Sequence, residues 1–259
     1  MREICLVGNS HVAALKLGLD QILAEGDISE CRFSVFGTRG TRLIHAQVQG
    51  GVLQPSKKDS EACFDHRSGP HVQLRLDDYD DIYFTIGTRP DRFPHFNPYF
   101  LLNYLDSTCQ QLQPLSLPLA TAITHHTIHG QWFSPLLHGM LEQSSRPTVH
   151  YLGSPFLSTR DPRAVAIHAQ LQENPENQPV LEDLLETIRT SVESLETERL
   201  RIPAPPPSVL DLHGCFSRQE YSQGSVRLTE DFDMEHGVRD FRHMNADYGR
   251  QIIENIIAQ

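Results

Sequence analysis

The chain has 259 residues and a formal net charge of −11, from 33 acidic and 22 basic residues. Its hydrophobic fraction of 39% provides enough apolar material for a core, which excludes wholesale disorder. The longest Lys/Arg run is the pair Lys57-Lys58, so the basic stripe with which a nucleic-acid-binding protein displaces phosphate counterions is missing. No apolar stretch approaches the roughly 18 residues of a membrane span. We therefore expect a globular protein that binds neither nucleic acid nor a membrane.

The N-terminal stretch from Met1 to Gly8 carries an acidic residue and reaches glycine after a short apolar run. This pattern predicts a first β-strand and not a signal peptide. The five cysteines lie scattered at positions 5, 31, 63, 109 and 215, with no CxxC pair. An odd, scattered set without a secretion signal is typical of reduced thiols, which predicts a cytoplasmic protein.

Strand and helix patterns alternate along the chain. Short apolar runs predict five buried strands, over residues 4–7, 32–36, 81–86, 148–152 and 208–212. Apolar residues at helical spacing predict helices over residues 10–24, 162–173, 181–200 and 244–258, the middle two forming a helical pair. The polar segment from Gln49 to Pro70 predicts a surface excursion. Alternation of this kind favours one α/β domain with a doubly wound sheet of about five parallel strands.

A serine stands where the first predicted strand meets the first predicted helix, in Gly8-Asn9-Ser10-His11. A side chain there projects above the carboxyl ends of the strands, where open α/β sheets bind ligands. The helix N-terminus also favours a developing negative charge beside the Ser10 N–H group. The alternative is that Asn9 and Ser10 only cap the helix.

An acid and a histidine precede the last predicted helix, in Asp240-Phe241-Arg242-His243. An Asp three residues before a His can hold one imidazole nitrogen while the other takes a proton from a serine, as a catalytic triad requires. The alternative is a polar surface segment without a role in chemistry.

Together, the serine block after the first strand and the DxxH block before the last helix resemble the first and last blocks of the SGNH/GDSL hydrolase superfamily. That resemblance implies a flavodoxin-like, three-layer fold and the activity of a serine esterase, lipase, carbohydrate deacetylase or acyltransferase. It also implies that Ser10 is the nucleophile, His243 the general base and Asp240 the residue that orients His243. No metal ion or organic cofactor is implied.

The middle blocks of the family match in part. The resemblance implies that the N–H group of Gly37, after the second strand, serves the oxyanion hole with that of Ser10; Gly40 is the alternative glycine. In the third block Arg89 stands two residues after Gly87, where the family has an Asn that donates to the oxyanion. Arg89 is therefore expected either to replace that donor or to bind an anionic group of the substrate. Asn9 replaces the family's Asp in the first block and is expected to support local hydrogen bonds near the substrate.

Other residues offer alternative interpretations. If their segment is helical, His125, His126 and His129 have the i, i+3 and i, i+4 spacing of a zinc site, but that segment contains no acid. Asp211 and His213 form a rival acid–base pair. The aromatic residues Phe93, Phe96, Tyr99 and Phe100 can line a substrate pocket or pack in the core.

The sequence thus predicts a serine-dependent ester hydrolase that removes a short acyl group, such as acetyl, from a carbohydrate or small metabolite. One alternative is an acyltransferase that uses the same triad. The other is a non-catalytic binding protein on the same fold. The oligomeric state is not predicted.

Overall fold

The computed structural model describes residues 1–26, 28, 30–38, 42–54, 73–92, 115–131, 133–211, 214–227 and 234–259. At its centre lies a five-stranded sheet in the order β2-β1-β6-β7-β8, in which every neighbouring pair is parallel. Its strands are β1 (Arg2–Gly8), β2 (Cys31–Gly37), β6 (Asp81–Phe84), β7 (Thr148–Tyr151) and β8 (Leu200–Arg201). Counted within this sheet alone, the order is 2-1-3-4-5, which is that of flavodoxin. The predicted doubly wound α/β fold is confirmed.

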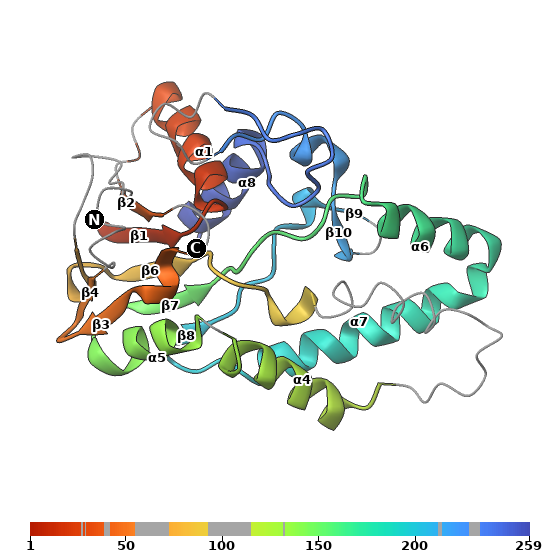
Figure 1. Ribbon diagram of the computed structural model, residues 1–259, viewed down its shortest axis with the longest axis horizontal. Coiled ribbons are helices and arrows are strands. Elements are labelled where there is room, and N and C mark those ends of the chain that lie inside the picture. The colour runs from red at the N-terminus through yellow and green to blue at the C-terminus, as the bar shows by residue number, and fades with distance from the viewer. Residues whose placement is uncertain are drawn as a thin grey trace.

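Helices cover both faces of the sheet (Figure 1). On one face lie α1 (Val12–Glu25) and α8 (Ala246–Ile257). The other face is covered by α4 (Leu117–His129), α5 (Ser134–Gln143) and α7 (Gln178–Glu193), and α6 (Pro162–Glu173) precedes α7. The predicted first and last helices and the helical pair are therefore present, although α7 ends at Glu193, before the predicted residue 200.

The core alternates between the two faces along each strand, as the two-residue period of a strand requires. In β1, Ile4 and Leu6 pack under α1 and α8, whereas Cys5 and Val7 face the opposite layer. All four side chains are completely buried. Because β1 is buried on both faces, its sequence is a continuous apolar run.

The α1 and α8 helices pack closely because glycine stands on both sides of their contact. A Cβ atom at Gly18 would lie 2.1 Å from the Arg250 nitrogen, and one at Gly249 would lie 1.8 Å from the Ala14 oxygen. Any side chain at either position would push the helices apart. The close contact brings the N-terminal ends of both helices to the same edge of the sheet (Figure 1).

Smaller elements complete the described fold. An antiparallel sheet contains β3 (Gln47–Gln49), β4 (Val52–Gln54) and β5 (Leu74–Arg75), and a two-stranded sheet contains β9 (Leu210–Asp211) and β10 (Phe216–Ser217). Short 3-10 turns span Arg42–His45, Leu76–Asp78, Pro90–Arg92, Pro175–Asn177, Pro207–Val209 and Gln219–Ser222. The predicted surface excursion begins with the β3–β4 hairpin, and its continuation lies outside the described residues. Within the described part, no helix has the length and apolar character to cross a membrane.

The prediction of a fifth sheet strand over 208–212 was wrong. The fifth strand is β8, before the proline-rich segment Pro203–Pro207 and not after it. Prolines lack the N–H group that a sheet needs, so the chain leaves the central sheet at this segment. It then forms the Pro207–Val209 turn, and β9 pairs with β10 instead.

Candidate active site

The turn between β1 and α1 presents Ser10. The backbone N–H of Val12 donates to the Asn9 carbonyl at 2.9 Å, and the Asn9 side-chain Oδ1 accepts from the His11 N–H at 3.2 Å. Asn9 thus supports the local turn, as expected. The Ser10 hydroxyl does not cap the helix, because its hydrogen-bond partner is His243.

A second turn, before α8, presents Asp240 and His243. The Asp240 Oδ1 accepts the backbone N–H groups of Arg242 at 2.9 Å and His243 at 3.0 Å. The helix itself begins after Asn245, whose side chain accepts from the Tyr248 N–H at 3.1 Å. These bonds fix the carboxylate relative to the imidazole before any substrate is present.

The structure brings the three predicted triad residues together. The Ser10 Oγ lies 2.9 Å from the His243 Nε2, although the residues are 233 positions apart. The His243 Nδ1 lies 2.8 Å from the Asp240 Oδ2. The side chains of His243 and Asp240 are 21% and 22% exposed, so a small molecule can reach the site from solvent.

The electrostatics set the tautomer of His243. Burial alone would raise the pKa of Asp240, but the backbone N–H groups of His243 and Arg242 and the His243 side chain lower it to about 2. An ionised carboxylate only accepts hydrogen bonds, so the proton of His243 lies on Nδ1. The Nε2 lone pair then faces the Ser10 hydroxyl, which is the arrangement of a nucleophile with its general base.

Two further histidines lie against His243. The His11 ring stacks on it with centroids 4.8 Å apart, and the His236 ring with centroids 3.8 Å apart and planes within 7°. The His236 Nδ1 also lies 3.1 Å from the Asp240 Oδ2. The sequence assigned no role to either residue. His11 adjoins Ser10, and His236 stands four residues before Asp240, outside the DxxH block.

Among the described residues, His236, Asp240 and His243 are the group whose potential metal-ligand atoms lie within 4.8 Å of one another. The two imidazole planes are nearly parallel, however, so their Nδ1 lone pairs do not converge as a tetrahedral ion requires. The His243 Nδ1 instead hydrogen-bonds to the Asp240 carboxylate, and the His236 ring stacks on the His243 ring.

The segment with His125, His126 and His129 is helical and belongs to α4. His129 Nδ1 lies 2.9 Å from Nε2 of His138 on α5, and its ring lies 4.1 Å from that of His125. These imidazoles are close to one another, but they do not belong to the group of potential metal ligands named above.

The backbone around Ser10 includes the N–H groups that the resemblance assigns to an oxyanion hole. No described residue accepts a hydrogen bond from the Ser10 N–H group. Gly37 pairs in register with Gly8, which places the end of β2 beside the turn that carries Ser10. Next to it, the Thr38 N–H donates to the Gly8 carbonyl at 3.0 Å, while the buried Thr38 hydroxyl has no partner among the described residues.

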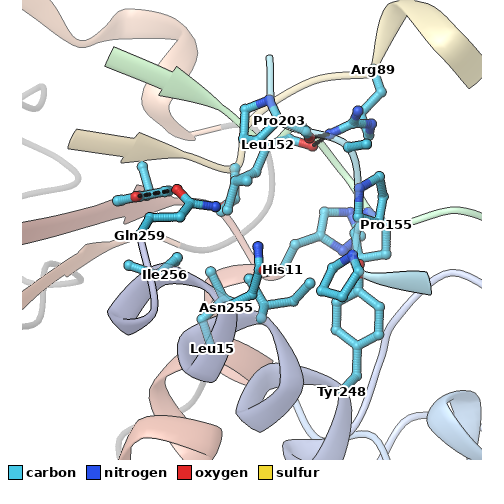
Figure 2. Close-up of a pocket in the computed structure, with 17 residues that line it drawn as sticks. His11, Leu15, Arg89, Leu152, Pro155, Pro203, Tyr248, Asn255, Ile256 and Gln259 are labelled. Carbon is cyan, nitrogen blue, oxygen red and sulfur yellow. Dashed lines mark hydrogen bonds between the residues drawn. The ribbon is translucent and has the colours of Figure 1, made fainter. Parts of the chain in front are cut away.

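Arg89 does not lie where the family resemblance led us to expect it. Its guanidinium is 2% exposed and forms an ion pair with Asp91 at 2.7 Å. It also donates to the carbonyl oxygens of Leu152 at 3.1 Å and Pro203 at 2.9 Å (Figure 2). Every guanidinium nitrogen therefore has an acceptor in the protein, because a nearby carboxylate and two carbonyls satisfy the buried charge. Arg89 ties together the ends of β6, β7 and β8 and is not brought to the Ser10 hydroxyl.

A narrow apolar crevice lies between α8 and the segment after β8 (Figure 2). His11 lines it together with Leu15, Leu152, Pro203 and Ile256, among other residues. Its volume of about 30 Å³ is enough for one or two water molecules.

Some alternatives fall outside the described residues. These are Gly40, His213 and the aromatic residues Phe93, Phe96, Tyr99 and Phe100. Asp211 and His213 were the alternative acid–base pair for Ser10. The imidazole that hydrogen-bonds to Ser10 is that of His243.

No family model and no curated protein matches this chain. Among solved structures, it is similar to the lipase Lip_vut3 from a goat rumen metagenome, with 12% identity over 100% of this chain and 97% of that one and a TM-score of 0.37. It is also similar to a DUF4886 family protein from Bacteroides uniformis, with 10% identity over 96% of this chain and 78% of that one and a TM-score of 0.34. Likenesses at this level assign no function.

Proposed function

We propose that this protein is a serine hydrolase of the SGNH type that cleaves carboxylic esters. The observation that carries the proposal is the continuous chain of hydrogen bonds from Ser10 through His243 to Asp240, at 2.9 Å and 2.8 Å. The sequence motifs around these residues, which resemble the first and last blocks of that superfamily, support the same conclusion.

In the proposed reaction, the Ser10 Oγ attacks the ester carbonyl while His243 Nε2 takes the hydroxyl proton. Asp240 stabilises the imidazolium that forms. The oxyanion of the tetrahedral intermediate accepts hydrogen bonds from the N–H groups of Ser10 and Gly37. His243 then gives its proton to the leaving alcohol, and water hydrolyses the acyl-serine by the same steps in reverse roles.

The resemblance to a superfamily that includes carbohydrate deacetylases favours a short acyl group. The triad carboxylate and imidazole are partly open to solvent, and a cavity of about 430 Å³ lies against Asp240. We therefore propose acetyl or a similarly small group, carried by a carbohydrate or another small metabolite.

The test is hydrolysis of a series of p-nitrophenyl esters from acetate to octanoate, with labelling of Ser10 by a fluorophosphonate probe. We expect turnover to be highest with the shortest esters. Ser10→Ala should lower kcat by about 10⁴-fold or more and abolish labelling.

Ser208→Ala is the matched control, because that hydroxyl lies on the surface and donates to the exposed Gln251 side chain. An unlabelled, inactive wild-type protein with a folded circular-dichroism spectrum would refute the proposal and favour a binding protein. Turnover that depends on an added acyl acceptor would identify an acyltransferase.

A further inference from the structure

A cavity of about 430 Å³ lies beside the Asp240 end of the candidate triad. Two stretches of the chain form its walls: residues 237–242, which carry Asp240, and the beginning of α6. Its volume lies in the range of pockets that bind small molecules. Its charged lining consists of Arg163, Arg239, Arg242, Asp161 and Asp240. We call it the arginine cavity.

Hydrogen bonds hold the two walls of the arginine cavity together. The Ser158 N–H donates to the Phe241 carbonyl at 2.9 Å. The Arg160 guanidinium donates to the Val238 carbonyl at 3.0 Å and lies over the Phe241 ring, 5.8 Å from its centroid. The cavity therefore lies between two segments whose relative position is fixed by the fold.

The two carboxylates of the lining have partners in the protein. The Arg163 guanidinium donates to both oxygens of Asp161, at 2.7 Å each. Oδ1 of Asp240 accepts two backbone N–H groups, and its Oδ2 lies 2.8 Å from the His243 Nδ1. The oxygens of both carboxylates are thus engaged with groups other than Arg239 and Arg242.

Arg239 and Arg242 carry the charges of the cavity that lack a partner. Both residues are exposed, and neither guanidinium has a hydrogen bond or an ion pair within the described part of the chain. The lining holds three arginines against two aspartates, whereas the whole chain has a formal net charge of −11. A protein with this net charge repels anions, so a positive cavity beside the triad attracts them locally against the overall field.

We propose that the arginine cavity binds an anionic group of the substrate, such as a carboxylate on the alcohol part of the ester. The planar guanidinium of arginine donates two parallel hydrogen bonds to the oxygens of such a group. This inference rests on the proposed function, because it concerns the substrate that Ser10 attacks.

The place of the cavity determines where the anionic group stands in the substrate. Among the described residues that line the cavity, neither Ser10 nor His243 occurs. The anionic group therefore stands apart from the scissile ester, as on a neighbouring sugar ring. Contacts remote from the reacting atoms stabilise the bound substrate and the transition state alike, so they lower KM and leave kcat unchanged.

The test compares two acetylated disaccharides, 3-O-acetylated α-1,4-digalacturonate and 3-O-acetylated α-1,4-galactobiose. They differ only in the carboxylate or hydroxymethyl group on each ring, and acetate release gives kcat and KM for both. We expect the acidic substrate to have a KM about 10-fold lower at equal kcat, since hydrogen bonds to a charged group contribute binding of this size.

The double variant Arg239→Ala, Arg242→Ala should remove the KM difference between the two substrates. Replacing both residues by Lys keeps the charges and should retain most of it. Arg75→Ala, at an exposed position of β5 outside the cavity, is the matched control. Equal KM values in the wild type, a difference that persists in the double Ala variant, or one that Arg75→Ala also removes would each overturn the inference.

Binding is also measured without turnover, by isothermal titration calorimetry with unacetylated digalacturonate and with inorganic phosphate. We expect digalacturonate to bind wild type and Ser10→Ala alike, and to bind about 10-fold more weakly to the double Ala variant. The affinity should fall as the salt concentration rises. Phosphate binding that depends on the two arginines, without a KM difference between the esters, would assign the cavity to a free anion and overturn its role in substrate binding.

The calorimetry also separates this inference from the proposed function. Binding of digalacturonate that depends on the two arginines, in a wild type without esterase activity, would refute the proposed function and leave the anion site in place. An active esterase that neither binds digalacturonate nor distinguishes the two esters would refute the arginine cavity alone.

Discussion

At the scale of single residues, two short turns hold the three side chains of the candidate triad. Ser10 stands in a short turn after a strand, and Asp240 and His243 stand three positions apart in another turn. These two short motifs named them only through their joint resemblance to the first and last blocks of the SGNH/GDSL superfamily. His236 was not named, because it stands outside the DxxH block; only the folded backbone shows that its ring stacks on that of His243.

For Arg89 the prediction from the sequence did not hold. It stands where the superfamily has its oxyanion-donating Asn, but its guanidinium is surrounded by other hydrogen-bond acceptors. No local pattern predicts that the carbonyl groups of Leu152 and Pro203, 63 and 114 positions away, accept its hydrogen bonds. Burial of a guanidinium requires such acceptors, and these acceptors are set by how three strand ends meet.

We predict that Arg89→Ala chiefly affects stability. The change leaves the Asp91 carboxylate and two carbonyls without their donor, at a cost of roughly 3 kcal/mol, the lower end of the range for breaking a buried pair because Asp91 is 19% exposed. Urea unfolding measures the loss, with Arg242→Ala, at an exposed position, as the control. A stable variant whose kcat on a neutral ester falls 10²-fold or more would instead show that Arg89 donates to the oxyanion.

At the scale of elements, the relative placement of α1 and α8 determines whether the triad forms. Helical periodicity predicted both helices, but not that they touch. Gly18 and Gly249 allow that contact, and it carries Ser10 and His243 to adjacent helix N-termini.

We predict that Gly249→Ala impairs both stability and turnover. The added Cβ would lie 1.8 Å from the Ala14 oxygen, so α8 must move away from α1. A displacement of about 1 Å between nucleophile and base costs on the order of 10²-fold in kcat. Thermal unfolding and p-nitrophenyl acetate hydrolysis measure the two effects.

Gly26→Ala is the control for that prediction, because a Cβ there meets nothing within 4 Å. Wild-type turnover in a fully folded Gly249→Ala protein would show that the helix contact does not set the triad geometry.

The wrong prediction of the fifth sheet strand also concerns the placement of elements. Residues 208–212 are as apolar as the other strands, and β8 is only two residues long, so local pattern favoured the wrong segment. What decides between them is the proline run after Ile202, which ends pairing in the parallel sheet before residue 208 is reached.

At the scale of the whole molecule, the two ends of the sheet have different tasks. The carboxyl ends of the strands carry the candidate triad, whereas a charged network lies toward the amino ends. There Asp81 accepts from Arg2 Nε at 2.6 Å and lies 2.6 Å from His150 Nε2, and Arg2 also donates to the Tyr83 hydroxyl at 3.1 Å. These side chains join β1, β6 and β7, so this end of the sheet stabilises the scaffold on which the other end is built.

We therefore predict that Asp81→Asn lowers stability without lowering kcat. Burial raises the pKa of Asp81, but hydrogen bonds with His150 and Arg2 outweigh it, so the pKa lies below its ordinary value. A depressed carboxyl pKa stabilises the fold above the unfolded value of about 3.9, and that contribution is lost as pH falls through the folded value. At pH 7 the variant should lose roughly 3 kcal/mol, at the low end for a buried pair because Arg2 is 26% exposed. Urea unfolding from pH 7 to pH 3 should show the difference from wild type shrinking with falling pH. A difference in unfolding free energy that stays constant with pH would contradict the stabilising role of ionised Asp81. A loss of kcat at pH 7 in the folded variant would contradict the separation of the stabilising end of the sheet from the end with the candidate triad.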